Sequence, residues 1–176
     1  MNTLLIKKIR LLGFLIILTV LASASLSTPT AVAATKTYEV GDITPTGGTV
    51  FFVLPSDTVS QWHYLEVAPD NWNSGKLFTT SYKQAENYVY TYANKSWYIP
   101  SSAEFATLTL EKRANRLKNI TLKPGGYWTS TGVVAKKQIQ SLQAFNTLTL
   151  KLTTHSYKNA MNGTVLLRVK PIRYFE

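Results

Sequence analysis

The sequence contains no cysteine, and this bounds both its stability and its chemistry. A chain without cysteine has no disulfide framework, so a folded domain must be held together by packing alone. The same absence rules out a thiolate nucleophile and a thiolate metal site. Any catalytic or metal site would have to use histidine, carboxylate and hydroxyl groups, and the sequence has only two histidines.

Acidic residues are also missing from one long stretch, since no Asp or Glu occurs between Lys112 and Phe175. Between Ala34 and Glu111, by contrast, eight acidic residues outnumber four lysines. Asymmetry of this kind within one domain favours a cationic surface facing an anionic partner. The alternative is that many of these cations are solvated or pair with the acidic half after folding. The twelve basic residues of the stretch are Lys112, Arg113, Arg116, Lys118, Lys123, Lys136, Lys137, Lys151, Lys158, Arg168, Lys170 and Arg173.

No hydrophobic run is long enough to span a membrane. The longest, residues 11–21, has about 11 residues, whereas a membrane-spanning helix needs roughly 20. It follows three basic residues and precedes a small-residue site at Ala31–Val32–Ala33, as in a secretory signal peptide. We therefore predict a signal peptide at residues 1–33 and one mature domain at residues 34–176, secreted to an extracellular or periplasmic location. A second cleavage site after Ala24 and an uncleaved anchor are the alternatives.

The first half of the mature chain combines strand and helix patterns. Residues 49–54 and 61–67 are rich in β-branched and aromatic residues and predict two strands. Apolar residues at spacings of three and four predict a helix over residues 80–93. Ser101 and Glu104 fit a capping box, which predicts that a second helix begins there.

The second half predicts sheet. Even-numbered apolar residues from Leu142 to Leu152 alternate with polar ones, which predicts one buried face. Residues 153–163 predict a polar loop, and residues 164–170 a strand with Arg168 and Lys170 on its solvent face. Pro171 should interrupt that strand at an edge or bend. The chain as a whole is predicted to be α+β.

Several segments resemble the Lcl C-terminal domain family, which is named after a collagen-like bacterial adhesin. The resemblance lies in GDITPTGGTVFF at residues 41–52, YLEVAP at 64–69, WYIPS at 97–101, YWTST at 127–131 and RVKPIR at 168–173. It implies a C-type-lectin-like fold, with two helices on antiparallel sheets and with the first and last strands paired. The adhesin is linked to anionic polysaccharide, and the family supplies no catalytic residues.

The sequence gives little support for a metal, cofactor or catalytic site. His63 and His155 are far apart, and no cysteine or nearby carboxylate completes a zinc site. Calcium requires carboxylate oxygens, and residues 128–163, where lectin-like folds usually bind it, contain none. We therefore expect no metal and no cofactor. A carboxylate pair among the eight acidic residues remains a minority alternative, because nothing marks any two of them as a pair.

The sequence thus predicts a non-catalytic binding or adhesion module, with an anionic glycan or another surface polyanion as its partner. The candidate ligand-binding residues are Lys136, Lys137, Tyr157 and Lys158, which we expect in exposed loops. In a polar loop, Tyr157 could stack on a sugar while Lys158 meets an anionic group. The alternatives are a module that binds a protein partner through a basic rim, and an envelope hydrolase that depends on carboxylates.

Overall fold

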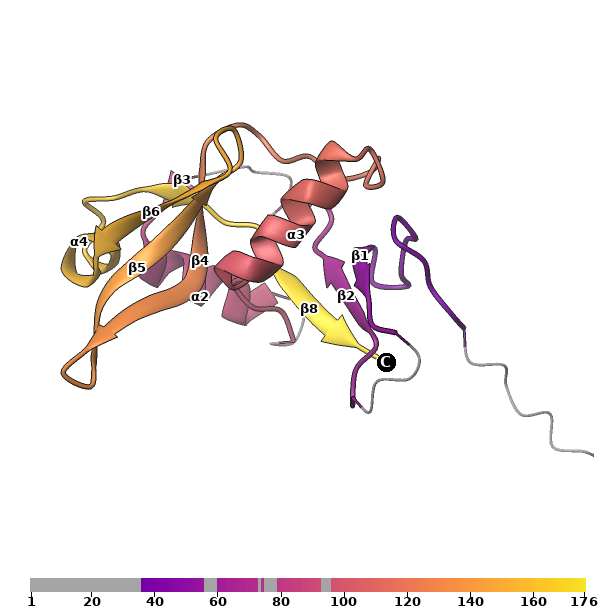
Figure 1. The fold of residues 1–176 in the computed structure, drawn as a ribbon, viewed down its shortest axis with the longest axis horizontal. Helices are drawn as coiled ribbons and strands as arrows, with labels where there is room; N and C mark the ends of the chain where they lie inside the picture. Colours follow the sequence, from indigo (N-terminus) through magenta and orange to yellow (C-terminus); the bar gives the residue numbers. More distant parts are fainter. Residues whose placement is uncertain (1–35, 56–59, 73, 75–78, 93–95) are drawn as a thin grey trace, which may run out of the picture. The chain divides into compact units, whose positions relative to one another are not determined.

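The structure, a computed structural model, describes residues 36–55, 60–72, 74, 79–92 and 96–176 (Figure 1). The predicted signal peptide and its cleavage sites lie outside these residues. The described fold belongs to a unit that extends from Thr37 to Glu176. Three helices and two sheets in this part of the chain make the fold α+β, which confirms the predicted class. Its elements are, in order, β1 (Thr49–Val53), β2 (Tyr64–Val67), β3 (Thr79–Thr80), α2 (Tyr82–Thr91), α3 (Ser102–Arg113), β4 (Gly126–Ala135), β5 (Gln138–Asn146), β6 (Lys151–Ser156), α4 (Tyr157–Met161), β7 (Leu167–Arg168) and β8 (Ile172–Phe175).

A three-stranded sheet holds the first and last strands, in the order β1–β2–β8. Both contacts are antiparallel, with Val67 of β2 opposite both Thr49 and Ile172. The expected direct pairing of the first strand with the last is therefore wrong, because β2 lies between them. β1 and β2 are close in sequence, so their pairing requires only a short loop closure. The other edge of β2 is then left for β8.

The second sheet has the order β3–β7–β4–β5–β6. β4 and β5 form a long antiparallel hairpin, and β6 pairs antiparallel with β5. β7 runs parallel to β4, through the single residue pair Tyr127 and Arg168. The expectation of wholly antiparallel sheets is corrected at this point. β7 follows β6 and α4 in the chain. It does not pair with β6 as the next antiparallel strand, but pairs with β4 at the edge away from β5.

The predicted alternation from Leu142 to Leu152 does not continue through one strand. Leu142 is buried, but Leu152 is 46% exposed. A turn interrupts the sheet between β5 and β6, and Leu150 there has a φ of 56°. Reversal at this turn places Leu152 opposite Phe145 rather than opposite Ala144. Because neighbouring residues of a strand point to opposite faces, Leu152 lies on the other face of the sheet from Leu142.

The polar loop predicted at residues 153–163 is also wrong. β6 continues to Ser156, and α4 begins directly after it. The Ser156 side chain accepts a hydrogen bond from the Asn159 backbone N–H and so caps the new helix. Tyr157 and Lys158 therefore lie in the first turn of a short helix rather than in a loop.

The two longer helices begin where the sequence predicts. α2 follows Ser81, whose side chain accepts from the Gln84 N–H. α3 has the predicted capping box, in which Ser101 Oγ accepts from the Glu104 N–H at 3.3 Å and Glu104 Oε2 accepts from the Ser101 N–H at 2.7 Å. The cap of α2 and the capping box of α3 satisfy donors that have no partner inside the helix.

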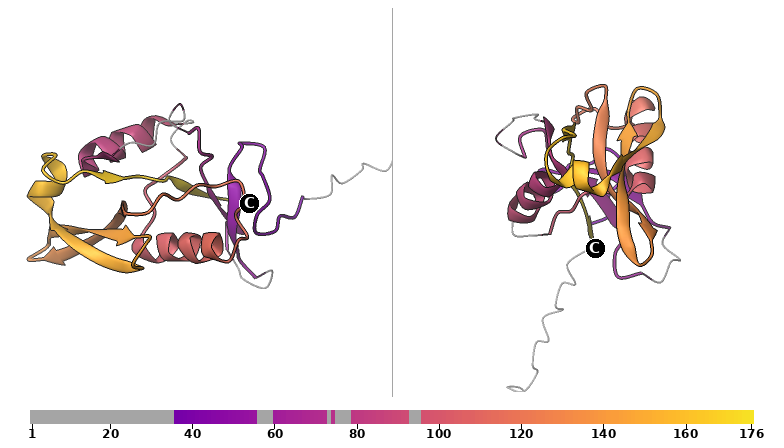
Figure 2. Two further views of the ribbon diagram at one scale, coloured as in Figure 1. Left: turned by 90° about the horizontal axis from the view of Figure 1, so that it is seen from above. Right: turned by 90° about the vertical axis from the view of Figure 1, so that its left-hand side faces the viewer.

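The core is divided by β4. Tyr127 and Trp128 are adjacent on this strand, so their side chains point to opposite faces. Trp128 packs in one buried cluster with Tyr82 of α2, and Tyr127 packs in the other with Phe105 of α3. Figure 2 accordingly shows α2 and α3 on opposite sides of the sheet.

Candidate functional site

The structure places the predicted ligand-binding residues at one end of the second sheet. Lys136 and Lys137 form the tip of the β4–β5 hairpin, with φ values of 51° and 62°. Tyr157 and Lys158 begin α4. All four are exposed, as expected.

No hydrogen bond or ion pair among the described residues joins these four side chains into one site. Ser156 lies opposite Ser141, whereas the hairpin tip lies beyond Gln138. Three residues along a strand separate these positions by about 10 Å. Tyr157 lies toward α2 and contributes, after burial and Glu86, to raising the pKa of Tyr82. The four residues therefore share a region of the surface but form no built pocket.

Three of the twelve cations of the acid-free stretch are used inside the fold. Arg116 pairs with Glu111, Arg173 with Glu66, and Lys170 with Asp70 at 2.7 Å between Nζ and Oδ1. This is the internal pairing that the sequence left open as an alternative.

The prediction that Lys170 faces solvent is wrong, because its side chain is completely buried. β7 ends at Arg168, so the alternation expected through residue 170 is not kept. Burial lowers the pKa of Lys170, and the Asp70 carboxylate opposes that shift. A buried cation persists when such a counter-charge lies within hydrogen-bond distance.

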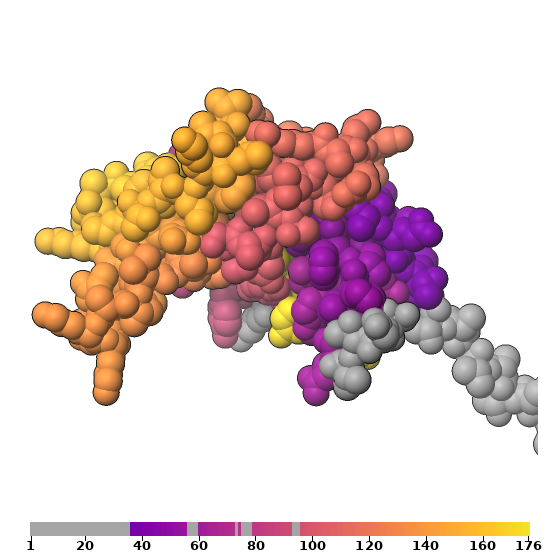
Figure 3. All heavy atoms as spheres, in the orientation of Figure 1, coloured from indigo at the N-terminus to yellow at the C-terminus, as the bar shows by residue number. Residues whose placement is uncertain are grey.

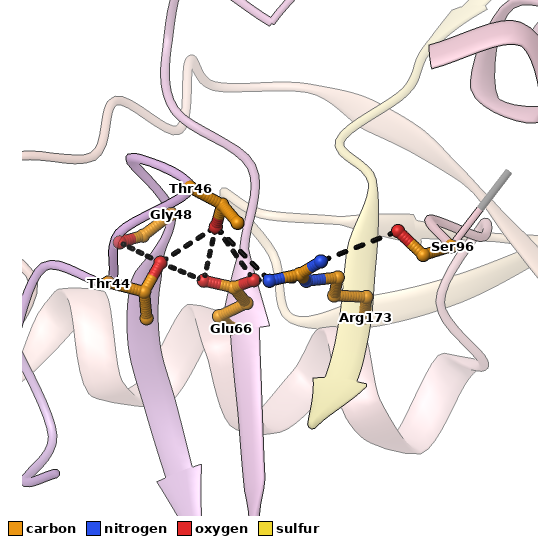
Figure 4. A network of polar contacts seen from close by, with 6 residues as sticks. All are labelled: Thr44, Thr46, Gly48, Glu66, Ser96 and Arg173. Atoms are coloured by element: carbon orange, nitrogen blue, oxygen red, sulfur yellow. Dashed lines mark hydrogen bonds and ion pairs between the residues drawn. The ribbon is translucent and has the colours of Figure 1, made fainter. Parts of the chain in front are cut away.

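Glu66 is the centre of a buried polar network in the first sheet (Figure 4). Its carboxylate accepts hydrogen bonds from the Thr44 hydroxyl, from the Thr46 hydroxyl at 3.0 and 3.1 Å, and from Arg173 Nε. The Arg173 guanidinium lies 5.2 Å from the centre of the Trp97 ring and also donates to Ser96 Oγ at 3.4 Å. Two strands, β2 and β8, and two loops are thereby tied together.

The Glu66 carboxylate at the centre of this network is closed to solvent. Glu66 is fully buried, and its partners occupy both carboxylate oxygens. Gly48 packs against it so tightly that an added Cβ would overlap the carboxylate and lie 3.1 Å from the Trp97 ring. The arrangement stabilises the sheet and gives Glu66 no access to a substrate.

A second group of cations gathers at the opposite end of the second sheet. There the end of α3, the α3–β4 connection and the β5–β6 turn lie side by side (Figure 3). Arg113 Nη2 donates to the Thr147 and Leu148 carbonyl oxygens at 2.7 and 2.8 Å, which joins α3 to the turn. Thr147 Oγ1 donates to the Lys123 carbonyl at 3.1 Å and joins the turn to the connection. We call the cations at this junction the basic edge, and they are Lys112, Arg113, Lys123, Lys151 and Arg168.

The remaining members of the basic edge are placed by neighbouring contacts. Lys112 Nζ donates to the Leu117 carbonyl at 2.9 Å, and Arg168 Nη1 donates to the Pro124 carbonyl at 3.1 Å. Lys151 opens β6 opposite Asn146, at the same end of the sheet. Carbonyl oxygens carry no formal charge, so these hydrogen bonds do not neutralise Lys112 or Arg168. A small hollow of about 120 Å³ lies between Lys112 and Arg113 at this edge.

Acidic residues near the basic edge are themselves paired or lie at its margin. Glu111 is held by Arg116, and Asp70 by Lys170. The turn that carries Asp42 approaches the Arg116 carbonyl through Gly41 and bounds the edge on that side. Positive charge therefore dominates from α3 across to β6.

One histidine, His155, lies in β6 of the second sheet, and the other, His63, directly precedes β2 of the first. His155 of β6 packs edge-on against Trp128, with 5.7 Å between ring centres, and His63 lies beside Tyr64. Across the ranges that the structure describes, no three His, Asp or Glu side chains come together as metal ligands. None of the helices in those ranges has the length and apolar character that crossing a bilayer requires.

Sequence reasoning missed the basic edge as a unit. Its residues belong to the acid-free stretch, but Arg113 and Leu148 are 35 positions apart and meet only through a tertiary hydrogen bond. The one local signal was the pair of cations at the end of the capped helix, Lys112 and Arg113, which marks a helix C-terminus in many proteins.

No protein-family model matches the chain, and a search of curated proteins finds no significant match. The resemblance to the Lcl C-terminal domain family stays a prediction.

Proposed function

We propose that the chain is a secreted, non-catalytic binding module for an anionic polymer, such as an acidic polysaccharide, and that the basic edge is its contact surface. This choice moves the site from the predicted hairpin tip and α4 to the far end of β5. Along that strand the hairpin tip lies roughly 25 Å from the basic edge, and the start of α4 lies about 17 Å from it.

The observation that carries this proposal is the junction made by Arg113. Its two hydrogen bonds hold the β5–β6 turn against α3, so cations from four separate segments share one end of the sheet. Polyanions bind such surfaces because each neutralised charge releases counterions. The lysines at the hairpin tip lack comparable support from neighbouring segments.

The absence of catalysis remains part of the proposal. Its support is that two acidic residues withdrawn from solvent, Glu66 and Glu104, have structural roles. Glu66 is enclosed by its donors, and Glu104 caps α3 while accepting from the Tyr98 hydroxyl at 2.8 Å. A carboxylate pair for hydrolysis would need both groups open to a substrate.

The proposal is tested with two matched double variants. Lys123→Gln with Lys151→Gln removes two exposed charges from the basic edge, and Lys136→Gln with Lys137→Gln removes two from the hairpin tip. Salt elution from heparin is compared with elution from a cation exchanger of matched charge density. The salt dependence of binding to a short DNA duplex provides a defined polyanion for quantitation.

The unaltered protein should elute later from heparin than from the exchanger. The basic-edge variant should lose that difference, and its slope of log affinity against log salt for duplex DNA should fall by about two. The hairpin-tip variant should keep most of the difference in elution and most of the salt slope. Equal losses in the two variants would mean that net charge, and not the basic edge, governs binding.

Binding of a protein partner is the second candidate, and the β4–β5 hairpin favours it. Val134 is 62% exposed and Ile139 is 46% exposed directly beside Lys136 and Lys137. Apolar side chains flanked by cations are typical of a protein interface with a basic rim. Such binding would depend only weakly on salt.

A further inference from the structure

Two hollows open on either side of Trp97 and Tyr98. The first has a volume of about 420 Å³ and the second about 400 Å³. Both volumes fall within the roughly 300–1,000 Å³ that small-molecule sites occupy. We call them together the aromatic trough, whose rings are Tyr82, Tyr90, Trp97, Tyr98 and Tyr174.

The walls of the aromatic trough are fixed by backbone and side-chain contacts. Tyr98 exchanges two backbone hydrogen bonds with Ile172 of β8, at 2.9 and 3.0 Å. The Ser130 N–H of β4 donates to the Pro100 carbonyl at 2.8 Å. The Arg173 guanidinium packs against the Trp97 ring while Glu66 holds it from the other side. A site preformed in this way costs a ligand little ordering of the protein.

Trp97 lines both hollows and carries a buried hydrogen-bond donor that no described residue accepts. Its side chain is only 4% exposed, yet its indole Nε1 has no partner in the part of the chain that the structure describes. Trp128, which is equally buried, donates its Nε1 to the Thr80 carbonyl at 2.8 Å. Buried donors are nearly always paired, so an unpaired one at the wall of a hollow points to an oxygen supplied by a ligand.

The first hollow also offers acceptors. Glu86 and Asn87 of α2 line it, together with Ser130. Burial raises the pKa of the Glu86 carboxyl, and a hydrogen bond from Tyr82 opposes that shift. No Lys or Arg lines either hollow among the described residues. The trough therefore differs in charge from the basic edge and suits a ligand without negative charge.

We infer that the aromatic trough binds neutral saccharide units of a glycan chain. A pyranose ring presents an apolar C–H face that packs on tyrosine and tryptophan rings, and hydroxyls that both donate and accept hydrogen bonds. One hydroxyl oxygen would accept from Trp97 Nε1, and another hydroxyl would donate to Glu86 or Asn87. The prolines of a proline-rich peptide would bring only carbonyl acceptors, which would satisfy Trp97 but supply no donor of their own to Glu86 or Asn87. Two adjoining hollows match two consecutive sugar units.

This inference does not depend on the basic edge, and its test keeps the two apart. Cellotetraose, chitotetraose and maltotetraose are added separately to the ¹⁵N-labelled protein, and the assigned Trp97 indole signal is followed. Dissociation constants are measured by tryptophan fluorescence for the protein and for Tyr90→Ala. The matched control is Tyr88→Ala, on the same helix, which is 44% exposed and does not line the trough. A fourth sample carries Lys123→Gln and Lys151→Gln.

At least one tetrasaccharide should shift the Trp97 indole signal. Tyr90→Ala should raise the dissociation constant of that sugar about fivefold or more. Tyr88→Ala and the basic-edge variant should change it by less than about twofold. A Trp97 signal that moves with none of the three sugars would overturn the inference, whether or not a proline-rich peptide moves it.

Discussion

The ion pair of Lys170 and Asp70 predicts a stability change that depends on which partner is removed. Lys170 is fully buried, whereas the Asp70 side chain is 37% exposed. Losing the counter-charge of a buried ion costs about 3–5 kcal/mol, because the remaining charge lies in a poorly solvating interior. Removing Lys170 instead leaves Asp70, whose carboxylate is reached by water and also accepts a hydrogen bond from the Thr121 N–H at 3.1 Å.

We therefore expect Asp70→Asn to lower the free energy of unfolding by about 3 kcal/mol at neutral pH. Lys170→Met keeps an unbranched chain of similar volume and should cost about 1 kcal/mol or less. Urea unfolding followed by tryptophan fluorescence measures both, with the exposed Lys158→Met as the control that should change little.

The pH dependence gives an independent check on the same pair. In Asp70→Asn the folded-state pKa of Lys170 should fall further below its unfolded value, since Asp70 no longer raises it. Between those two pKa values the unfolded chain binds more protons, so the stability of the variant should rise with pH until about 10.4.

For Asp70 itself, burial acts to raise the pKa, but hydrogen bonds from Lys170 and Thr121 outweigh it and hold the pKa below its usual value. The stabilisation by Asp70 is thus complete above the unfolded pKa of about 3.9 and is lost as pH falls through the folded pKa. A larger loss for Lys170→Met than for Asp70→Asn would refute this reasoning.

Two further predictions concern the Glu66 network and the cap of α3. Gly48→Ala should destabilise the protein by about 2 kcal/mol or more, because the new methyl group overlaps the Glu66 carboxylate. Thermal unfolding measures this loss. An unchanged unfolding midpoint would mean that the network adjusts freely. Ser101→Ala should cost about 1 kcal/mol by removing the cap of α3, whereas Thr107→Ala, whose hydroxyl bonds only within the helix to the Ala103 carbonyl, should cost less. Equal losses in urea unfolding would contradict the role given to the cap.

Sequence patterns predicted those parts of the fold that depend on nearby residues. The strand at residues 49–54, the helix over residues 80–93 and the capping box at Ser101 were placed within a few residues, because their apolar spacing and caps act over one or two turns. The interruption at Pro171 was also correct, since the chain leaves β7 before it and enters β8 after it.

Patterns that continue across a turn failed. Leu142 and Leu152 have the same parity in sequence, but the turn at residues 147–150 reverses the chain and places them on opposite faces. Lys170 was assigned to the solvent face from alternation alone, whereas a carboxylate 100 residues away draws it into the interior. In both cases the deciding contact lies outside the window in which a pattern is defined.

The α+β class, the capping box of α3 and the concentration of positive charge in the second half of the chain follow from the sequence alone. Tertiary structure decided which of those charges remain available. It paired Lys170 and Arg173 with carboxylates from distant segments, and it gathered the basic edge around the hydrogen bonds of Arg113. It likewise brought the rings of the aromatic trough together from α2, β8 and the segment before α3. The physical reason is that charge and capping follow from composition and local geometry, whereas a binding surface requires distant segments to meet.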